Sequence, residues 1–185
     1  MILSDIDIKK SLSSGDLNIF SNIPLYIGPS SVDLTLSPFA EIFIPGFGEN
    51  IDTKNDNRKM FTEHNFSERG YLKIYPGEFY LLSTNETIVL NKKMAAFVHG
   101  RSSLARLGLN IHLAGFIDPQ FSGTITMEVS NFTQKPIVLY PNMRICQIVF
   151  MKTSSEVEIG YGEKSDRKYQ GQEKPGLSKI HEDKI

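Results

Sequence analysis

The sequence has one cysteine, almost no net charge and no long apolar run, and each shortage excludes a class of protein. Cys146 is the only cysteine among 185 residues, so the chain can form neither an internal disulfide nor a cysteine-based zinc site. The formal net charge is -1. Because binding to a phosphate backbone usually needs a basic face, we expect no nucleic-acid polymer as a partner.

No segment approaches the roughly 20 apolar residues of a membrane-spanning helix. The first ten residues, MILSDIDIKK, are acidic where a signal peptide needs basic residues followed by an apolar run. We therefore expect no membrane partner and a cytoplasmic location. The length suits one domain with a sizeable core.

The N-terminus carries the pattern of a short helix. Ser4 and Asp7 resemble a capping box, which predicts a helix over residues 5–12 that ends at Gly15. Its predicted apolar stripe is Ile6, Ile8 and Leu12.

Most of the remaining chain has the period-two alternation of β-strands. SVDLTL, residues 31–36, reads as a half-buried strand, and the polar residues 46–58 read as a surface loop. Further strands are predicted at 71–75, 78–83, 86–90, 94–98, 124–130, 136–140 and 144–150. Short strands separated by turns at this spacing are typical of a sandwich, jelly roll or barrel. SSLARLGL, residues 102–109, favours one or two helical turns, and the charged chain past Gly160 resembles a flexible tail.

GRSSLARLGL, residues 100–109, has the composition of an anion site. Arg101 and Arg106 carry planar guanidinium groups that suit phosphate, and Ser102 and Ser103 stand at a possible helix start. The alternative is a strand-to-helix connection with solvated arginines and capping serines.

Two strands carry polar residues that point either to a site or to the surface. In TITMEVS, residues 124–130, Glu128 shares one face with Thr124, Thr126 and Ser130, and Met127 belongs to the other. Glu128 is therefore a surface residue or a carboxylate in a site. Asp118-Pro119 reads as a turn. In RICQIVF, residues 144–150, Gln147 is either a site residue or a polar residue on one side of an edge strand, and the sequence favours neither.

Taken in order, several segments resemble the dCTP deaminases, including bifunctional deaminase-diphosphatases, and their trimeric dUTPase relatives. The combination of GRSSLAR, IDP and MEVSN is far more specific than any single glycine pattern. The matching segments are MILSDIDI, SVDLTL, GRSSLARLGL, AGFIDPQFSG (114–123), TMEVSN (126–131), RICQIVF (144–150) and KYQGQ (168–172).

This resemblance implies a mainly β, jelly-roll-like distorted barrel of dUTPase-like fold over residues 1–160, with a short N-terminal and a short central helix. Residues 161–185 would be a C-terminal lid that closes over the nucleotide. The resemblance also implies a homotrimer with active sites between subunits. The implied substrate-binding residues are Arg101, Ser102, Ser103, Leu104, Ala105, Arg106, Ala114, Asp118, Thr126, Met127, Glu128, Gln147, Tyr161, Lys168 and Gln172.

The implied activity is that of a hydrolase in dUMP and dTTP precursor supply. Glu128 would act as base and then acid in the deamination of dCTP, with Ser102 and Ala114 orienting water and Arg106 balancing charge. Zinc-dependent deamination is excluded by the lack of cysteine ligands. Asp118 would activate water for dUTP hydrolysis, with Mg²⁺ held through the substrate phosphates and no protein metal ligands.

Two alternatives remain. The single residue Leu113 between His112 and Ala114 makes a shorter loop than in dedicated deaminases and matches trimeric dUTPases, which favours a dUTP diphosphatase only. Glu128 points the other way, since plain dUTPases usually lack it. The second alternative is a non-enzymatic, nucleotide-binding regulatory module.

Overall fold

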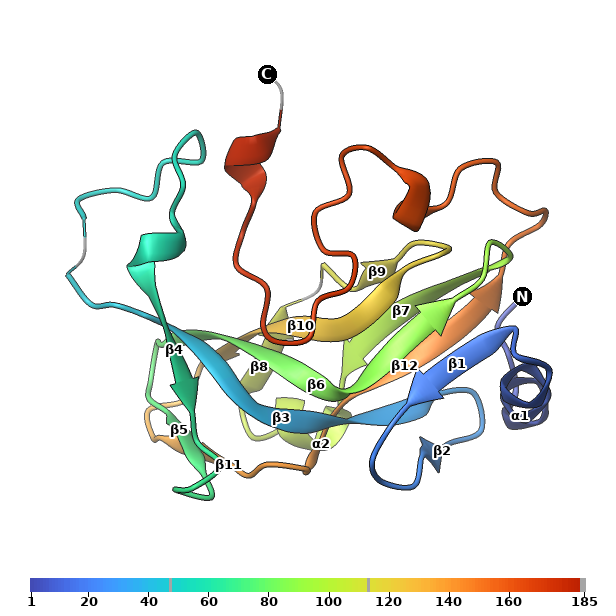
Figure 1. Cartoon of the computed structure of the whole chain (residues 1–185). Coiled ribbons are helices and arrows are strands. Elements are labelled where there is room, and N and C mark those ends of the chain that lie inside the picture. Colours follow the sequence, from blue (N-terminus) through green and yellow to red (C-terminus); the bar gives the residue numbers. More distant parts are fainter. Residues whose placement is uncertain (47, 113, 184–185) are drawn as a thin grey trace.

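Long antiparallel strands form a strongly curled sheet in the computed structural model, which describes residues 1–46, 48–112 and 114–183 (Figure 1). Leu113 and the end of the predicted lid, 184–185, lie outside the described residues. The strands are β1 (Leu17–Phe20), β2 (Tyr26–Ile27), β3 (Val32–Phe43), β4 (Phe61–Asn65), β5 (Leu72–Ile74), β6 (Phe79–Leu90), β7 (Met94–Gly100), β8 (Leu109–His112), β9 (Phe116–Ile117), β10 (Ser122–Asn131), β11 (Ile137–Leu139) and β12 (Arg144–Lys152). The helices are α1 (Asp5–Ser14), α2 (Ser102–Ala105) and the 3₁₀ turns η1 (Arg58–Met60), η2 (Tyr161–Glu163) and η3 (Ile180–Glu182).

The central strand β3 joins the two halves of the main sheet. The sheet has the order β8-β10-β6-β3-β12-β7-β9, with β1 on β6, and β2 and β4 on β3, while β5 and β11 pair separately. β3 pairs with β12 up to Thr35 and with β6 from Leu36 onward. Pro38 lies in the register shift between Leu36 and Ala40, since proline donates no ladder hydrogen bond. The architecture confirms the predicted mainly β fold.

Helix α1 begins at the predicted residue and stops at the predicted Gly15, but it extends two residues beyond the predicted range 5–12. The Asp7 amide donates to Ser4 Oγ over 3.3 Å, and Gly15 takes the left-handed conformation that ends the helix. Ile8 is fully buried, but Ile6 is 59% exposed, so its place in the predicted stripe is wrong. Two helical positions are about 200° apart, which turns Ile6 away from Ile8. In the described residues no helix is long and apolar enough to cross a membrane.

Both faces of β3 are covered, which corrects the prediction of a half-buried strand. Thr35, on the supposed polar face, has no exposed surface. Its backbone N–H and its hydroxyl donate to the two carboxylate oxygens of Glu86 on β6, over 2.9 and 2.7 Å. Glu86 is only 2% exposed. A buried carboxylate persists in a folded protein when donors satisfy it in this way.

The two strands predicted at 78–83 and 86–90 are one continuous strand, β6. The residues where the two predicted strands meet are polar and resemble a turn, but their side chains form hydrogen bonds inside the sheet. Ser83 Oγ lies 2.7 Å from Ser37 Oγ, and Thr84 Oγ1 accepts a hydrogen bond from the Ile125 amide over 3.0 Å. Asn85 donates to the carbonyl of Leu36. Tertiary hydrogen bonds therefore override the turn preference of these residues.

Sequence patterns missed the short strands β1, β2, β4, β8 and β9. Each has five residues or fewer. The strands β5 and β11 are equally short, but they were recognised within the longer predicted runs 71–75 and 136–140. The loop predicted at 46–58 is confirmed in its described part up to η1, and Pro76-Gly77 forms the predicted turn. The strand predicted at 94–98 runs on to Gly100 as β7.

Replacing Thr35 by Val should lower the free energy of unfolding by about 1–3 kcal/mol, because the buried Glu86 carboxylate loses a donor that water cannot replace. Urea denaturation measures the change. Thr62→Val, at an exposed position on β4, should stay within about 0.5 kcal/mol of the parent. Equal losses in the two variants would contradict the role given to the Thr35–Glu86 pair.

Candidate active site

A cavity of about 490 Å³ lies between β10, β6 and the C-terminal segment. Residues from three separate motifs of the sequence meet in its wall. From the predicted site they are Ala114, Asp118, Thr126, Glu128, Tyr161 and Gln172. The fold therefore gathers into one space residues that are up to 58 positions apart in the chain.

Glu128 faces the cavity because of its position in β10. It lies directly opposite Leu81 of β6, which also lines the cavity, and directly opposed residues in an antiparallel pair share a face. The neighbouring Met127 and Val129 are 1% and 0% exposed and belong to the core. The alternation inferred from the sequence is confirmed for residues 126–129, and Glu128 lies in a cavity wall rather than on an open surface. It fails at Ile125, which was expected on the face of Met127 but also lines the cavity, because the register shifts between Thr124 and Thr126.

Met127 does not line this cavity, and its predicted place beside the base stays a prediction. Its side chain is buried in the core and reaches only a small neighbouring cavity of about 30 Å³. Thr126 and Glu128 line this small cavity as well, so Met127 borders the smaller of the two cavities that Glu128 lines.

Asp118 reaches the same cavity from the turn between β9 and β10. The Phe121 amide donates to the Asp118 carbonyl over 3.2 Å, and Gln120 has a φ of 68°, which closes the turn predicted at Asp118-Pro119. One cavity thus holds two carboxylates, from Asp118 and Glu128, on separate elements. Such a pair provides two groups able to accept protons from water.

The C-terminal segment is folded against β10, which corrects its interpretation as a flexible tail. The Thr124 amide donates to the Gln172 carbonyl over 2.9 Å, and Gln172 Nε2 donates back to the Thr124 carbonyl over 2.6 Å. The Gly171 amide donates to the Ser122 carbonyl over 2.7 Å. Figure 1 shows this red part of the chain lying across β10. The segment therefore forms one wall of the cavity.

Tyr161 holds the start of this segment in place. Its ring lies 5.9 Å from that of Phe121, and its hydroxyl accepts hydrogen bonds from the amides of Lys168 and Tyr169 over 3.2 and 2.9 Å. The Lys168 ammonium pairs with Asp183 at 2.5 Å, and this carboxylate raises the pKa of Lys168. Tyr161 thus borders the cavity, whereas Lys168 is engaged with the end of the segment.

The arginine motif, residues 101–106, lies outside the cavity. Arg101 and Arg144 both contact Asp33, at 3.4 and 3.1 Å, and Gln147 is paired with Asp33 along the strands. In the part of the chain that the structure describes, neither residues 101–106 nor Gln147 line the cavity. Figure 1 shows α2 below the sheet and the C-terminal segment above it. A single chain therefore leaves the predicted phosphate contacts apart from the predicted catalytic carboxylates.

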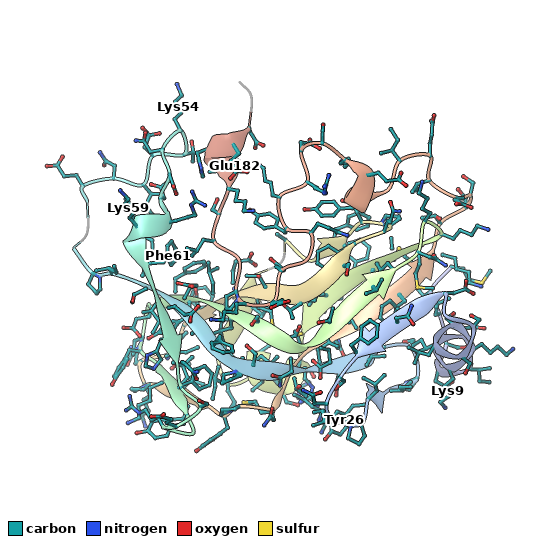
Figure 2. The ribbon with its side chains drawn as sticks, in the orientation of Figure 1. Lys9, Tyr26, Lys54, Lys59, Phe61 and Glu182 are labelled. Carbon is teal, nitrogen blue, oxygen red and sulfur yellow. The ribbon has the colours of Figure 1, made fainter. Side chains whose placement is uncertain are left out.

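Sequence reasoning missed the apolar wall of the cavity. Phe61, Phe79, Leu81, Phe116 and Tyr169 line it. Tyr169 lies within the KYQGQ segment, which matches the family, so its place in the site could have been predicted from the sequence. Phe61 stands at the start of β4 (Figure 2), outside the matching segments, and only the packing of β4 beside β3 brings it to the cavity.

The described residues contain no group of three or more His, Cys, Asp or Glu side chains arranged to hold a metal ion. Cys146 is fully buried, and burial raises the pKa of its thiol well above its usual range. A thiol in such surroundings stays protonated and makes a poor metal ligand.

A family model described as dCTP deaminase-like matches residues 2–153. The chain belongs to the dCTP deaminase-like family. Two curated relatives named "dCTP deaminase, dUMP-forming" are each 42% identical: one from Corynebacterium efficiens over 97% of this chain and 94% of its own length, and one from Dictyoglomus thermophilum over 99% and 96%.

The fold of this dCTP deaminase-like chain is similar to solved structures of a deaminase and of dUTPases. A 2'-deoxycytidine 5'-triphosphate deaminase from Agrobacterium tumefaciens matches 82% of the chain with a TM-score of 0.63 and 24% identity, and the match spans 48% of that longer chain. The EIAV dUTPase matches 77% of the chain and 93% of its own, with a TM-score of 0.51 and 16% identity. At these identities the likeness concerns the fold, and it confirms the predicted dUTPase-like architecture.

Replacing Tyr161 by Phe should loosen the start of the C-terminal segment and leave the ring contact with Phe121 intact. The amides of Lys168 and Tyr169 lose their acceptor, and one net hydrogen bond of about 1 kcal/mol corresponds to roughly fivefold faster amide exchange. Hydrogen exchange read by mass spectrometry measures this. Tyr140→Phe, at an exposed site, serves as the control, and unchanged exchange in Tyr161→Phe would contradict the assignment.

Proposed function

We propose that the protein deaminates dCTP and then hydrolyses the resulting dUTP to dUMP and pyrophosphate. The observation that carries the proposal is the presence of Glu128 and Asp118 in the wall of one cavity that is large enough for a nucleotide base and sugar. The curated relatives, more than 40% identical along almost the whole chain, bear names that describe the same overall conversion.

In the first reaction Glu128 takes a proton from water as the water oxygen bonds to carbon 4 of the cytosine ring. Glu128 then delivers this proton to the amino nitrogen, and the bond between carbon 4 and that nitrogen breaks with release of ammonia. The remaining hydroxyl proton at carbon 4 moves to ring nitrogen 3, which gives uracil. One carboxylate suffices because it serves as base and then as acid. The apolar wall formed by Leu81 and Phe79 supports this role, since excluding water from a site strengthens the electrostatic interactions between its charged groups and the substrate.

In the second reaction Asp118 activates water against the α-phosphate of dUTP, and pyrophosphate leaves. Magnesium would enter with the nucleotide and neutralise its phosphate oxygens. Magnesium usually keeps several waters and binds substrate phosphates rather than an all-protein set of ligands, so no residue of this chain is assigned to it. The lid prediction for residues 161–185 fits the proposed reaction, since Tyr161 and Gln172 border the cavity. The predicted cytoplasmic location stays a prediction.

We propose further that the active unit is a homotrimer in which a neighbouring subunit brings Ser102 and Arg106 to the cavity. The support is geometric: Figure 1 shows α2, which begins at Ser102 and ends just before Arg106, below the sheet, whereas the C-terminal segment that borders the cavity lies above it. Ser102 and Arg106 are also exposed, so their side chains are accessible to a partner. A cyclic trimer with one repeated interface would complete three equal sites.

Incubation with dCTP and Mg²⁺ followed by chromatography separates the candidate functions. The parent enzyme should form dUMP, Glu128→Gln should release no ammonia from dCTP yet still hydrolyse dUTP, and Asp118→Asn should accumulate dUTP. Each loss should exceed about 100-fold, the usual contribution of a positioned acid or base. Hydrolysis of dUTP without ammonia from dCTP would select a dUTP diphosphatase, and binding without turnover would select a regulatory module.

Mixing two inactive variants tests the shared site. Glu128→Gln and Arg106→Ala subunits, exchanged at equal amounts, should regain about one quarter of the parent deaminase activity, because each of two positions is filled correctly half of the time. Light scattering should give the mass of three chains. A mixture that stays inactive after proven subunit exchange would place all catalytic groups within one chain.

A further inference from the structure

Lys174 connects the C-terminal segment to β4, which is separated from β10 by β6 and β3 in the sheet. Its ammonium lies 2.8 and 3.0 Å from the two carboxylate oxygens of Glu63 on β4, which is 111 residues away in the chain. The same ammonium lies 4.5 Å from the centre of the Phe39 ring. Two contacts of different kinds, with a carboxylate and with an aromatic face, thus hold one lysine.

Glu63 belongs to a row of side chains that crosses the sheet on the cavity side. Glu128 on β10 is opposite Leu81 on β6, Leu81 is opposite Glu41 on β3, and Glu41 is opposite Glu63. Directly opposed residues share a face, so all four side chains lie on the face that bears the cavity. The Lys174–Glu63 contact therefore forms on this face, in the same row as Glu128.

Two like charges stand next to each other in this row. Glu41 is 9% exposed, and burial together with the neighbouring Glu63 raises the pKa of its carboxyl. Directly opposed like charges destabilise a strand pair. The Lys174 charge acts on Glu41 in the opposite direction, so the C-terminal segment supplies the cation that this pair of strands lacks.

The residues on both sides of Lys174 are hydrogen-bonded to β10, on the other side of the cavity from β4. Gly171 and Gln172 pair with Ser122 and Thr124 of β10, and the Gly176 amide donates to Thr126 Oγ1 over 2.9 Å. Gly176 and Ser178 line the cavity. Residues 171–178, here called the strap, therefore run across the cavity face, with hydrogen bonds to β10 and an ion pair to β4.

We propose that Lys174 is a positioning residue that keeps the strap closed over the cavity through its ion pair with Glu63. The inference deepens the proposed function, on which its kinetic part rests, while its structural part concerns the chain alone. Lys174 and Glu63 are both about half exposed, at 48% and 45%, so the pair shifts the open–closed equilibrium only by a factor of about two to five. A shift of that size is enough to change how much nucleotide is needed to occupy the site.

Charge reversal tests the proposal. Lys174→Glu should speed hydrogen exchange at the amides of Thr124, Gly171 and Gly176 by about two- to fivefold. Glu63→Lys should do the same, and the double variant with the charges swapped should return exchange to the parent rate. Lys174→Met is a milder variant if charge reversal disturbs folding, which circular dichroism monitors. Lys93→Glu, which breaks an exposed pair with Glu156, is the matched control and should leave these amides unchanged.

Kinetics with dCTP give the second measurement. In Lys174→Glu the KM should rise by the same factor as exchange, while kcat stays within about twofold because Glu128 and Asp118 are untouched. Unchanged exchange in Lys174→Glu, or no recovery in the swapped variant, would overturn the proposal. Inactivity of the parent chain on both dCTP and dUTP, with exchange behaving as described, would refute the proposed function and leave the ion-pair assignment standing.

Discussion

The pairing register between β10 and β6 is the constraint on which the site depends. Glu128 faces the cavity only because it stands opposite Leu81, and a shift by one residue would bury it and expose Met127 in its place. The register shift between Thr124 and Thr126 is held by the Ile125 amide, which donates to Thr84 Oγ1 inside the sheet. A buried hydroxyl in the middle of β6 thus helps to decide which face carries the carboxylate.

The same strand explains why a polar C-terminal segment is ordered. β8 pairs with β10 only from Glu128 to Asn131, so the outer edge of residues 122–126 is left for another partner. Unpaired backbone groups at a strand edge bind any extended chain that reaches them. Residues 171–172 take this place, and the cavity forms where the segment crosses the face of the sheet. Order in the segment comes from the edge that receives it rather than from its own composition.

Much of the local structure was predictable from the sequence, because it depends on neighbours in the chain. The capping box at Ser4, the end of α1 at Gly15 and the alternation around Glu128 all follow from spacing over a few residues. The short strands and the burial of Thr35 were not predictable in this way. Thr35 is buried against Glu86, which is 51 residues away and accepts a hydrogen bond from its hydroxyl. No pattern among neighbouring residues indicates a contact over that distance.

The sequence by itself determined the β-rich class, the family and the two carboxylates, because ordered motifs and strand periodicity are local properties. Only the tertiary structure decided that Glu128 and Asp118 share a cavity. It also decided that the arginine motif of the same chain lies apart from them and that Lys174 reaches Glu63. These outcomes depend on strand order, register and bulges, which join residues far apart in the chain and leave no trace in the spacing of any one segment.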